Sequence, residues 1–173
     1  MQVKNSHRKL LKLALFLLLL APCQNLSAQI IDSSFYQWTI YELQSDEFDE
    51  KKCYMITYPI KSESDHNYRE KPYIMITRYQ NRRFEEVSVF SGYEYKIHSK
   101  VLVAIDDKKF LLTTNKDMSW TKNKNEDVFI IQKMLDSASL KVRSDSAIGT
   151  FAVDEYSLKG IAKAYNRLKK ICE

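Results

Sequence analysis

The sequence has few of the residues from which recognisable catalytic and cofactor motifs are built. Its 173 residues include three glycines, three prolines, three cysteines and three histidines. The glycines stand far apart, at Gly92, Gly149 and Gly160. This spacing excludes the dinucleotide fingerprint and the Walker A loop, which need several close glycines to bring backbone amides near phosphate. The Gly-x-Ser-x-Gly elbow of the α/β-hydrolases is also absent.

Histidine and cysteine offer no metal or catalytic set either. His66 and His98 stand in separate segments, and neither has a second ligand at the helical spacing typical of zinc sites. We predict that both are solvated or packed. Cys53 with a distant histidine is conceivable as a nucleophile, but a structural cysteine is the simpler interpretation. The sequence therefore predicts no catalytic residue, no metal site and no cofactor, and a protein that is not an enzyme.

The first 28 residues are typical of a secretory signal peptide. Residues 10–21 form an apolar run too short for a comfortable membrane span, and we expect cleavage after Ala28. A lipoprotein signal ending at Cys23 is an alternative, disfavoured by Pro22; an uncleaved anchor is another, disfavoured by the short run. The positive charges before and within the run are Lys4, Arg8, Lys9 and Lys12.

Removing residues 1–28 changes the charge of the chain. The whole sequence has 27 basic and 22 acidic residues, and residues 1–28 hold four of the basic ones and none of the acidic ones. The remaining chain has a net charge near zero. The basic excess of the whole sequence therefore gives no support for a nucleic-acid partner. It also contains no further segment expected to cross a membrane.

Two cysteines remain after cleavage. An even pair in an exported protein predicts a disulfide between Cys53 and Cys172. Two free buried thiols are the alternative.

Alternating apolar residues predict a mainly β fold. We expect residues 29–34 to be a flexible leader and residues 35–173 to form one domain. Asp106–Asp107 fit a hairpin turn better than acid–base chemistry. Many short strands at this spacing favour an antiparallel β-sandwich over a βαβ fold. The expected strands are 35–44, 51–60, 73–80, 84–91, 100–105, 109–114, 139–146 and 149–155.

Two polar stretches, 61–71 and 115–127, are expected to be loops. Trp120 in the second is predicted to cover the core, with a ligand-stacking role as the alternative. A short helix follows, for which Asn125 can act as N-cap.

The chain ends in an amphipathic helix over residues 155–172. Ser157 is the expected N-cap, and Cys172 falls on the apolar face. Four basic residues form the opposite stripe: Lys159, Lys163, Arg167 and Lys170. This stripe could bind anionic lipid headgroups or an acidic partner, whereas a solvated face is the simpler interpretation.

Several segments resemble the invasion-associated locus B family of exported bacterial proteins. They include "CYM" at 53–55 leading to Pro59, "PYIMITR" at 72–78, "VSVFSGYEY" at 87–95 with Gly92–Tyr93, and "GTFAVDEYSLKGIAKAY" at 149–165. The early Trp38 with Tyr41, "AIDDKKF", Trp120 and the terminal cysteine also match.

The resemblance implies an immunoglobulin-like β-sandwich in the periplasm or at the outer membrane, without transferable catalytic residues. It implies a role in host-cell entry through an envelope or host-surface protein. The alternative is a periplasmic binding module or chaperone for an envelope component, using exposed tyrosines such as Tyr93 and Tyr95.

Overall fold

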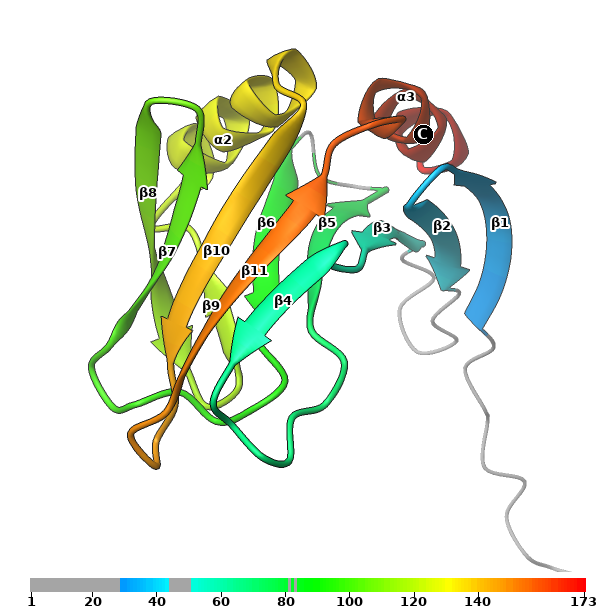
Figure 1. Ribbon diagram of the computed structural model, residues 1–173. Helices are drawn as coiled ribbons and strands as arrows, with labels where there is room; N and C mark the ends of the chain where they lie inside the picture. The colour runs from blue at the N-terminus through cyan, green and yellow to red at the C-terminus, as the bar shows by residue number, and fades with distance from the viewer. Residues whose placement is uncertain (1–28, 44–50, 81, 83) are drawn as a thin grey trace, which may run out of the picture.

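The strands of the computed structural model form one antiparallel sheet (Figure 1). The structure describes residues 29–43, 51–80, 82 and 84–173; the predicted signal peptide lies outside them. The strands are β1 (Gln29–Phe35), β2 (Trp38–Leu43), β3 (Lys52–Thr57), β4 (Lys61–Ser64), β5 (Tyr73–Tyr79), β6 (Glu85–Phe90), β7 (Lys100–Ile105), β8 (Lys108–Asn115), β9 (Met118–Trp120), β10 (Ser139–Asp145) and β11 (Phe151–Ser157).

The eleven strands follow the order β1-β2-β3-β5-β6-β9-β8-β7-β10-β11-β4. The sheet folds over, so that β10, β11 and β4 lie opposite β5 and β6 (Figure 1). We call these two facing parts of the sheet its two walls. Helices α2 (Lys124–Asp136) and α3 (Ile161–Ile171) lie at one end of both walls. The predicted mainly β, antiparallel fold is confirmed, although hydrogen bonding runs through one continuous sheet. Immunoglobulin-like connectivity stays a prediction.

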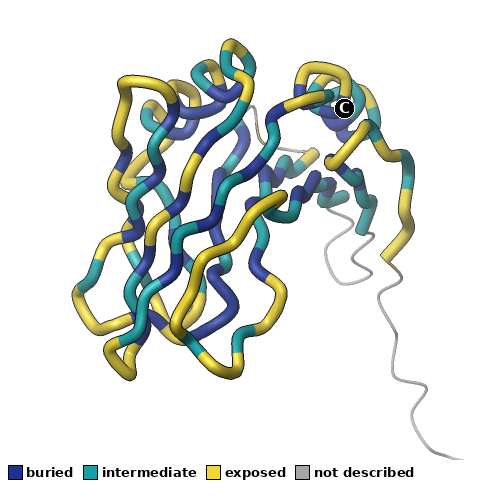
Figure 2. The backbone as a smooth tube through the Cα atoms, viewed as in Figure 1, coloured by how far each residue is buried: buried dark blue, intermediate teal, exposed yellow. Residues whose placement is uncertain are grey.

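Strand residues alternate between a buried and a more exposed side (Figure 2). In β10, Leu140 and Val142 point into the core while Lys141 and Arg143 are exposed. Side chains from both walls and both helices join a single hydrophobic core. This period of two matches the pattern expected for an antiparallel sheet with one buried face.

The predicted flexible leader, residues 29–34, is instead strand β1. It pairs with β2 from Gln29 to Phe35, with an irregularity between Ile31 and Ser33. The carboxylate of Asp32 also accepts two hydrogen bonds from Arg167 of α3. These contacts involve residues far along the chain, so the polar local sequence did not indicate them.

The two polar stretches predicted to be loops also contain strands. Residues 61–64 form β4, which pairs with β11 at the edge of the sheet. Residues 118–120 form β9, which bridges β6 and β8. Both strands are short and are defined by their partners more than by local propensity.

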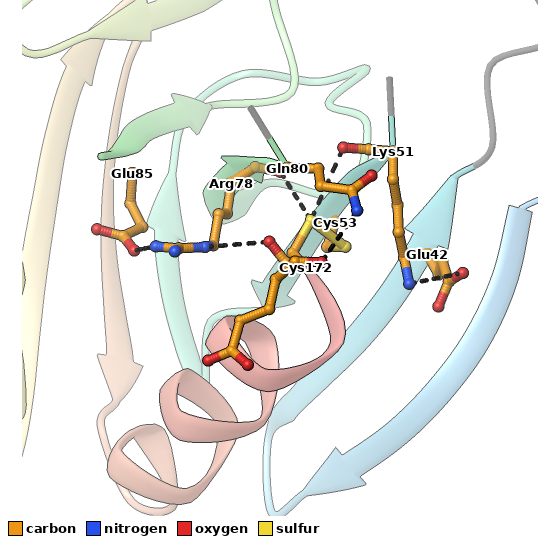
Figure 3. The surroundings of a disulfide bond; sticks show 8 residues. Glu42, Lys51, Cys53, Arg78, Gln80, Glu85 and Cys172 are labelled. Atoms are coloured by element: carbon orange, nitrogen blue, oxygen red, sulfur yellow. Dashed lines mark hydrogen bonds and ion pairs between the residues drawn. A yellow bond between two sulfur atoms is a disulfide. The ribbon is translucent and has the colours of Figure 1, made fainter. Parts of the chain in front are cut away.

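The predicted disulfide between Cys53 and Cys172 is confirmed. It joins β3 to the end of α3, with Cα atoms 5.9 Å apart, and both residues are fully buried (Figure 3). The Arg78 guanidinium beside it is paired with Glu85. The closing helix is thereby tied covalently to an early strand.

Helix α3 begins later than predicted. Ser157 is not its N-cap, because β11 continues to pair with β10 as far as Ser157. Gly160 precedes the helix at φ 90°. A Cβ atom at Gly160 would lie 2.7 Å from the carbonyl oxygen of Phe35, so glycine permits both the left-handed backbone and the close approach of β1.

Helix α2 is capped by Asn123 and not by the predicted Asn125. The Asn123 side chain accepts hydrogen bonds from the backbone amides of Asn125 and Glu126. These two amides have no hydrogen-bond acceptor within the first turn of the helix, and the cap supplies one. Neither helix, nor any other helix in the described ranges, is long and apolar enough to cross a membrane.

Candidate functional site

The outer side of strands β2, β3, β5, β6 and β9 carries a continuous set of aromatic side chains, which we call the aromatic face. Its members are Tyr41, Tyr54, Tyr58, Tyr73, Phe90 and Trp120, with Ile56, Met75 and Met118 among them. Their neighbours along each strand, such as Ile40, Met55 and Ile74, are buried in the core. The alternation therefore places the aromatic residues on the opposite side of the sheet.

Strand register brings these residues together in rows across the sheet. Tyr41 is opposite Tyr54, and their rings stack with centroids 5.1 Å apart. Tyr73 is opposite Phe90, also at 5.1 Å between ring centroids. The Tyr73 hydroxyl contacts the sulfur of Met118. Such cross-strand aromatic pairs hold their side chains in fixed positions and so preform a surface.

Two small residues lie between the aromatic rows. Thr77 is opposite Tyr54, and Ser88 is opposite both Met75 and Trp120. Both are buried, and their hydroxyl groups have no hydrogen-bond partner within the described chain. Buried hydroxyl groups are usually paired, so this surface is incompletely satisfied by the protein itself.

Three tyrosines of the aromatic face, Tyr41, Tyr54 and Tyr73, are held as neutral phenols by burial. Burial is the main cause that raises the pKa of Tyr54 to about 12, and interaction with nearby tyrosines adds to it. Burial also raises the pKa of Tyr41 and Tyr73 above the ordinary value. Each ring can therefore stack through its face while its hydroxyl both donates and accepts hydrogen bonds.

Cationic side chains lie at the margin of the aromatic face. Lys71 lies 3.6 Å from the ring centroid of Tyr58. Lys52 and Arg82 lie over the ring of Tyr79, at 5.3 and 4.3 Å. A centre of aromatic and apolar residues with charge at the rim is the composition of a protein-binding surface.

The prediction that Trp120 covers the core is wrong, because Trp120 belongs to the aromatic face. It is partly exposed, whereas Ser119 beside it is fully buried. Strand β9 pairs with β6 and β8, which turns the indole outward. The geometry is compatible with the alternative stacking role.

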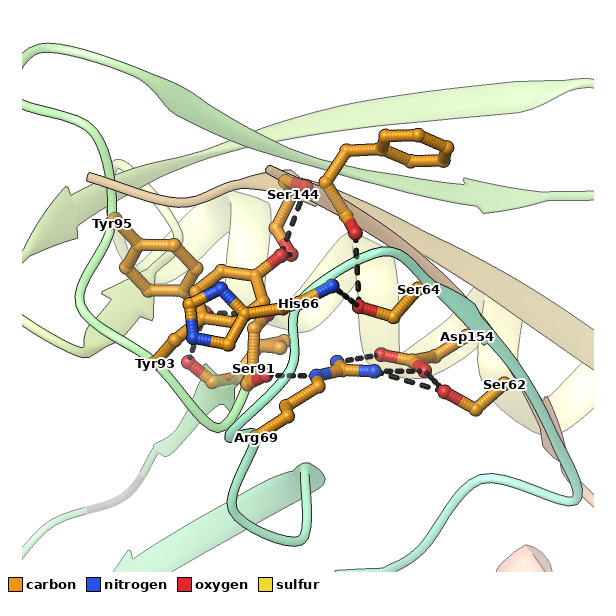
Figure 4. A network of polar contacts seen from close by, with 11 residues as sticks. Ser62, Ser64, His66, Arg69, Ser91, Tyr93, Tyr95, Ser144 and Asp154 are labelled. Carbon is orange, nitrogen blue, oxygen red and sulfur yellow. Dashed lines mark hydrogen bonds and ion pairs between the residues drawn. The ribbon is translucent and has the colours of Figure 1, made fainter. Parts of the chain in front are cut away.

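The tyrosines predicted to be exposed, Tyr93 and Tyr95, are buried instead. The Tyr93 hydroxyl bonds to Ser144, and the Tyr95 hydroxyl donates to Ser91 (Figure 4). His66, expected to be solvated or packed, lies against the Tyr93 ring and contacts Thr150. These residues hold loops together and do not present a binding surface.

A buried ion pair anchors the same loops. The Arg69 guanidinium makes two hydrogen bonds to Asp154 of β11, one of them 2.9 Å long, and a third to the carbonyl oxygen of Ser91 (Figure 4). The Asp154 carboxylate also accepts a hydrogen bond from Ser62. The Arg69 and Asp154 side chains are only 9% and 1% exposed. The pair therefore joins β4, β11 and the loop after β6 at a largely buried site.

A shallow hollow of about 310 Å³ adjoins the aromatic face at the loop end. Its lining includes Phe90, Tyr93 and the carboxylates of Glu70, Glu94 and Asp117. No group of three or more histidine, cysteine or acidic side chains in the described ranges is placed to hold a metal ion.

The four basic residues predicted to form one stripe differ in their surroundings. Lys159, Lys163 and Lys170 are exposed, while Arg167 is committed to Asp32 in β1. Arg167 therefore stabilises the packing of α3, and the three lysines alone remain available to a partner.

No family model, curated protein or solved structure matches this chain. The resemblance to the invasion-associated locus B family stays a prediction from the sequence.

Proposed function

We propose that this protein is an exported, non-enzymatic binding protein of the bacterial cell envelope, which binds a protein partner through the aromatic face. The single observation that carries the proposal is the strand register, which places tyrosine, phenylalanine and tryptophan side chains in adjacent rows on one outward side of the sheet. The signal-like N-terminus and the Cys53–Cys172 disulfide support export.

The composition of the aromatic face favours a protein partner. Tyrosine, tryptophan, phenylalanine and methionine are enriched at the centres of protein interfaces, and charged residues are depleted there. Four of the rings already contact each other in cross-strand pairs, so binding them orders little additional side-chain motion. A nucleic-acid partner would instead favour a strongly positive groove beside the rings.

The partner is in the envelope or on a host cell. The resemblance to the invasion-associated locus B family favours a role in host-cell entry for a periplasmic or outer-membrane-associated protein. The alternative is a periplasmic binding module or chaperone for an envelope component. Both use the same surface but different partners.

Site-directed photo-crosslinking tests the proposal and separates the two roles. Benzoylphenylalanine would replace Tyr41 or Tyr58 in the exported protein, with Lys141 as the matched control. Lys141 is exposed on β10, in the opposite wall (Figure 1). We expect discrete adducts from the two tyrosine positions and none from Lys141.

Adducts formed only when host cells are present would support host-cell entry, and adducts formed in bacteria alone would support the envelope role. Absence of adducts at both tyrosine positions, or the same adducts at Lys141, would contradict the use of the aromatic face.

A further inference from the structure

We propose that the outward side of α3, together with the β1–β2 turn, docks on an anionic phospholipid bilayer. This lysine corner is defined by Lys159, Lys163, Lys169, Lys170 and Tyr36. It is distinct from the aromatic face, so the inference does not rest on the proposed function. Figure 1 shows α3 beside the β1–β2 hairpin at one corner of the molecule.

The orientation of α3 is fixed, and its outward side is cationic. Ile161, Ala164 and Leu168 are buried against the sheet. Lys163 and Lys170 lie on the other side of the helix and are exposed. The disulfide at Cys172 holds the end of the helix in place, so the helix cannot roll to bury these lysines.

The lysines of this corner are not neutralised by carboxylates of the described chain. Lys163 and Lys170 form no ion pair there, in contrast to Arg167, which is paired with Asp32. Lys159 and Lys169 lie over aromatic rings, 4.5 Å from the centroid of Tyr36 and 4.6 Å from that of Tyr165. Lys163 and Lys170 thus share the outward side of α3, with the exposed Lys159 just before the helix. This cationic side is complementary to an anionic surface.

Exposed apolar side chains of β1 and of the turn after it favour a bilayer over a soluble anionic polymer. Tyr36, in the β1–β2 turn and in contact with Lys159, is 66% exposed, and Ile30 near the start of β1 is 55% exposed. At a membrane surface, lysine stems and tyrosine rings enter the interface while the ammonium groups contact headgroups. A soluble polyanion would bind the charges but gain nothing from these apolar groups.

Vesicle binding of the exported protein provides the test. Vesicles of phosphatidylglycerol and phosphatidylethanolamine are compared with vesicles of phosphatidylcholine alone, and a column of immobilised heparin serves as the soluble polyanion. We expect the wild type to bind the anionic vesicles and not the zwitterionic ones. In Lys163→Glu/Lys170→Glu we expect the vesicle partition coefficient to fall by about 30-fold or more, from the per-lysine attraction of an anionic surface.

Two further variants make the test specific. Lys96→Glu/Lys109→Glu changes the net charge equally at exposed positions outside the corner, and it should bind anionic vesicles nearly as well as the wild type. Tyr36→Asn suits the positive φ of 57° at this position, and it should weaken vesicle binding without changing retention on heparin. The proposal is overturned if the wild type does not bind anionic vesicles, if both double variants lose binding equally, or if Tyr36→Asn has no effect.

Discussion

The disulfide should provide much of the stability of this domain, because it closes a very long segment of the unfolded chain. Cys53 and Cys172 are separated by 119 residues. For a ring of this size the chain-entropy relation gives about 5 kcal/mol at room temperature, which is an upper value. Domains of this kind are commonly stable by only about 5–15 kcal/mol, so the reduced protein should be marginal.

The cleanest perturbation is reduction, because the reduced protein keeps both sulfur atoms in the core. Both cysteines are fully buried, so the protein must be reduced while unfolded and then refolded under reductant. Urea unfolding followed by circular dichroism would measure the free energy. With a slope of about 2 kcal/mol per M, the loss of 5 kcal/mol should lower the midpoint by about 2.5 M.

The variant Cys53→Ala/Cys172→Ala is the control for the reductant. Its midpoint should be close to that of the reduced wild type and should not respond to reductant. A reduced wild type that loses less than about 1 kcal/mol would refute the argument, since the cross-link would then constrain little that the folded contacts do not already hold.

Two further predictions concern buried charge. Arg69→Met should cost about 3–5 kcal/mol of unfolding free energy by leaving the Asp154 carboxylate buried without its partner, and Arg69→Met/Asp154→Leu should recover most of the loss; a double variant as unstable as the single one would show that charge is not the cause. Burial raises the pKa of Asp127 above 3.8, its ordinary value. Wild-type stability relative to Asp127→Asn should therefore be greatest below that value and fall as the pH rises through the folded pKa; a difference independent of pH in urea unfolding would contradict this.

The elements that were predicted correctly are those whose signals are local. Alternation identified β3, β5 and β6, the Asp106–Asp107 turn joins β7 to β8, and the cysteine pair emerged once the signal segment was set aside. Helix α2 was also predicted, with Val128, Ile131 and Leu135 on its apolar face. Ile131 is buried and Leu135 packs against the core, but Val128 is 46% exposed, and Ile130 and Met134 are buried in its place.

The elements that were missed depend on distant partners. β1 contains the polar "DSS" stretch, and it is ordered by β2 and by Arg167, which lies 135 residues beyond Asp32. Asp154 and Arg69 were not singled out, because a buried ion pair cannot be inferred from two residues 85 positions apart. Ser157 looked like a helix cap, since the sequence alone could not show that β11 continues to that position.

The aromatic face could be predicted from the sequence only in part. Alternation along the strand at 51–60 is enough to place Tyr54 and Tyr58 on one side and Cys53 and Met55 on the other. It could not show that Tyr41 lies beside Tyr54, or that Trp120 joins them through β9, because register and strand order decide both.

The outer sides of the two walls differ in composition, and this difference favours the proposal that the aromatic face binds a partner. An antiparallel sheet needs only one apolar side to fold, and its other side is normally polar. The wall that contains β10 and β11 comes closer to this rule, with Lys141, Arg143 and Glu155 on its outer side beside Val153 and Phe151. The wall that contains β3, β5 and β6 does not follow it, although its inner side is already buried in the core. Folding explains the inner residues of that wall, whereas the partner that we propose would explain the aromatic rings on its outer side.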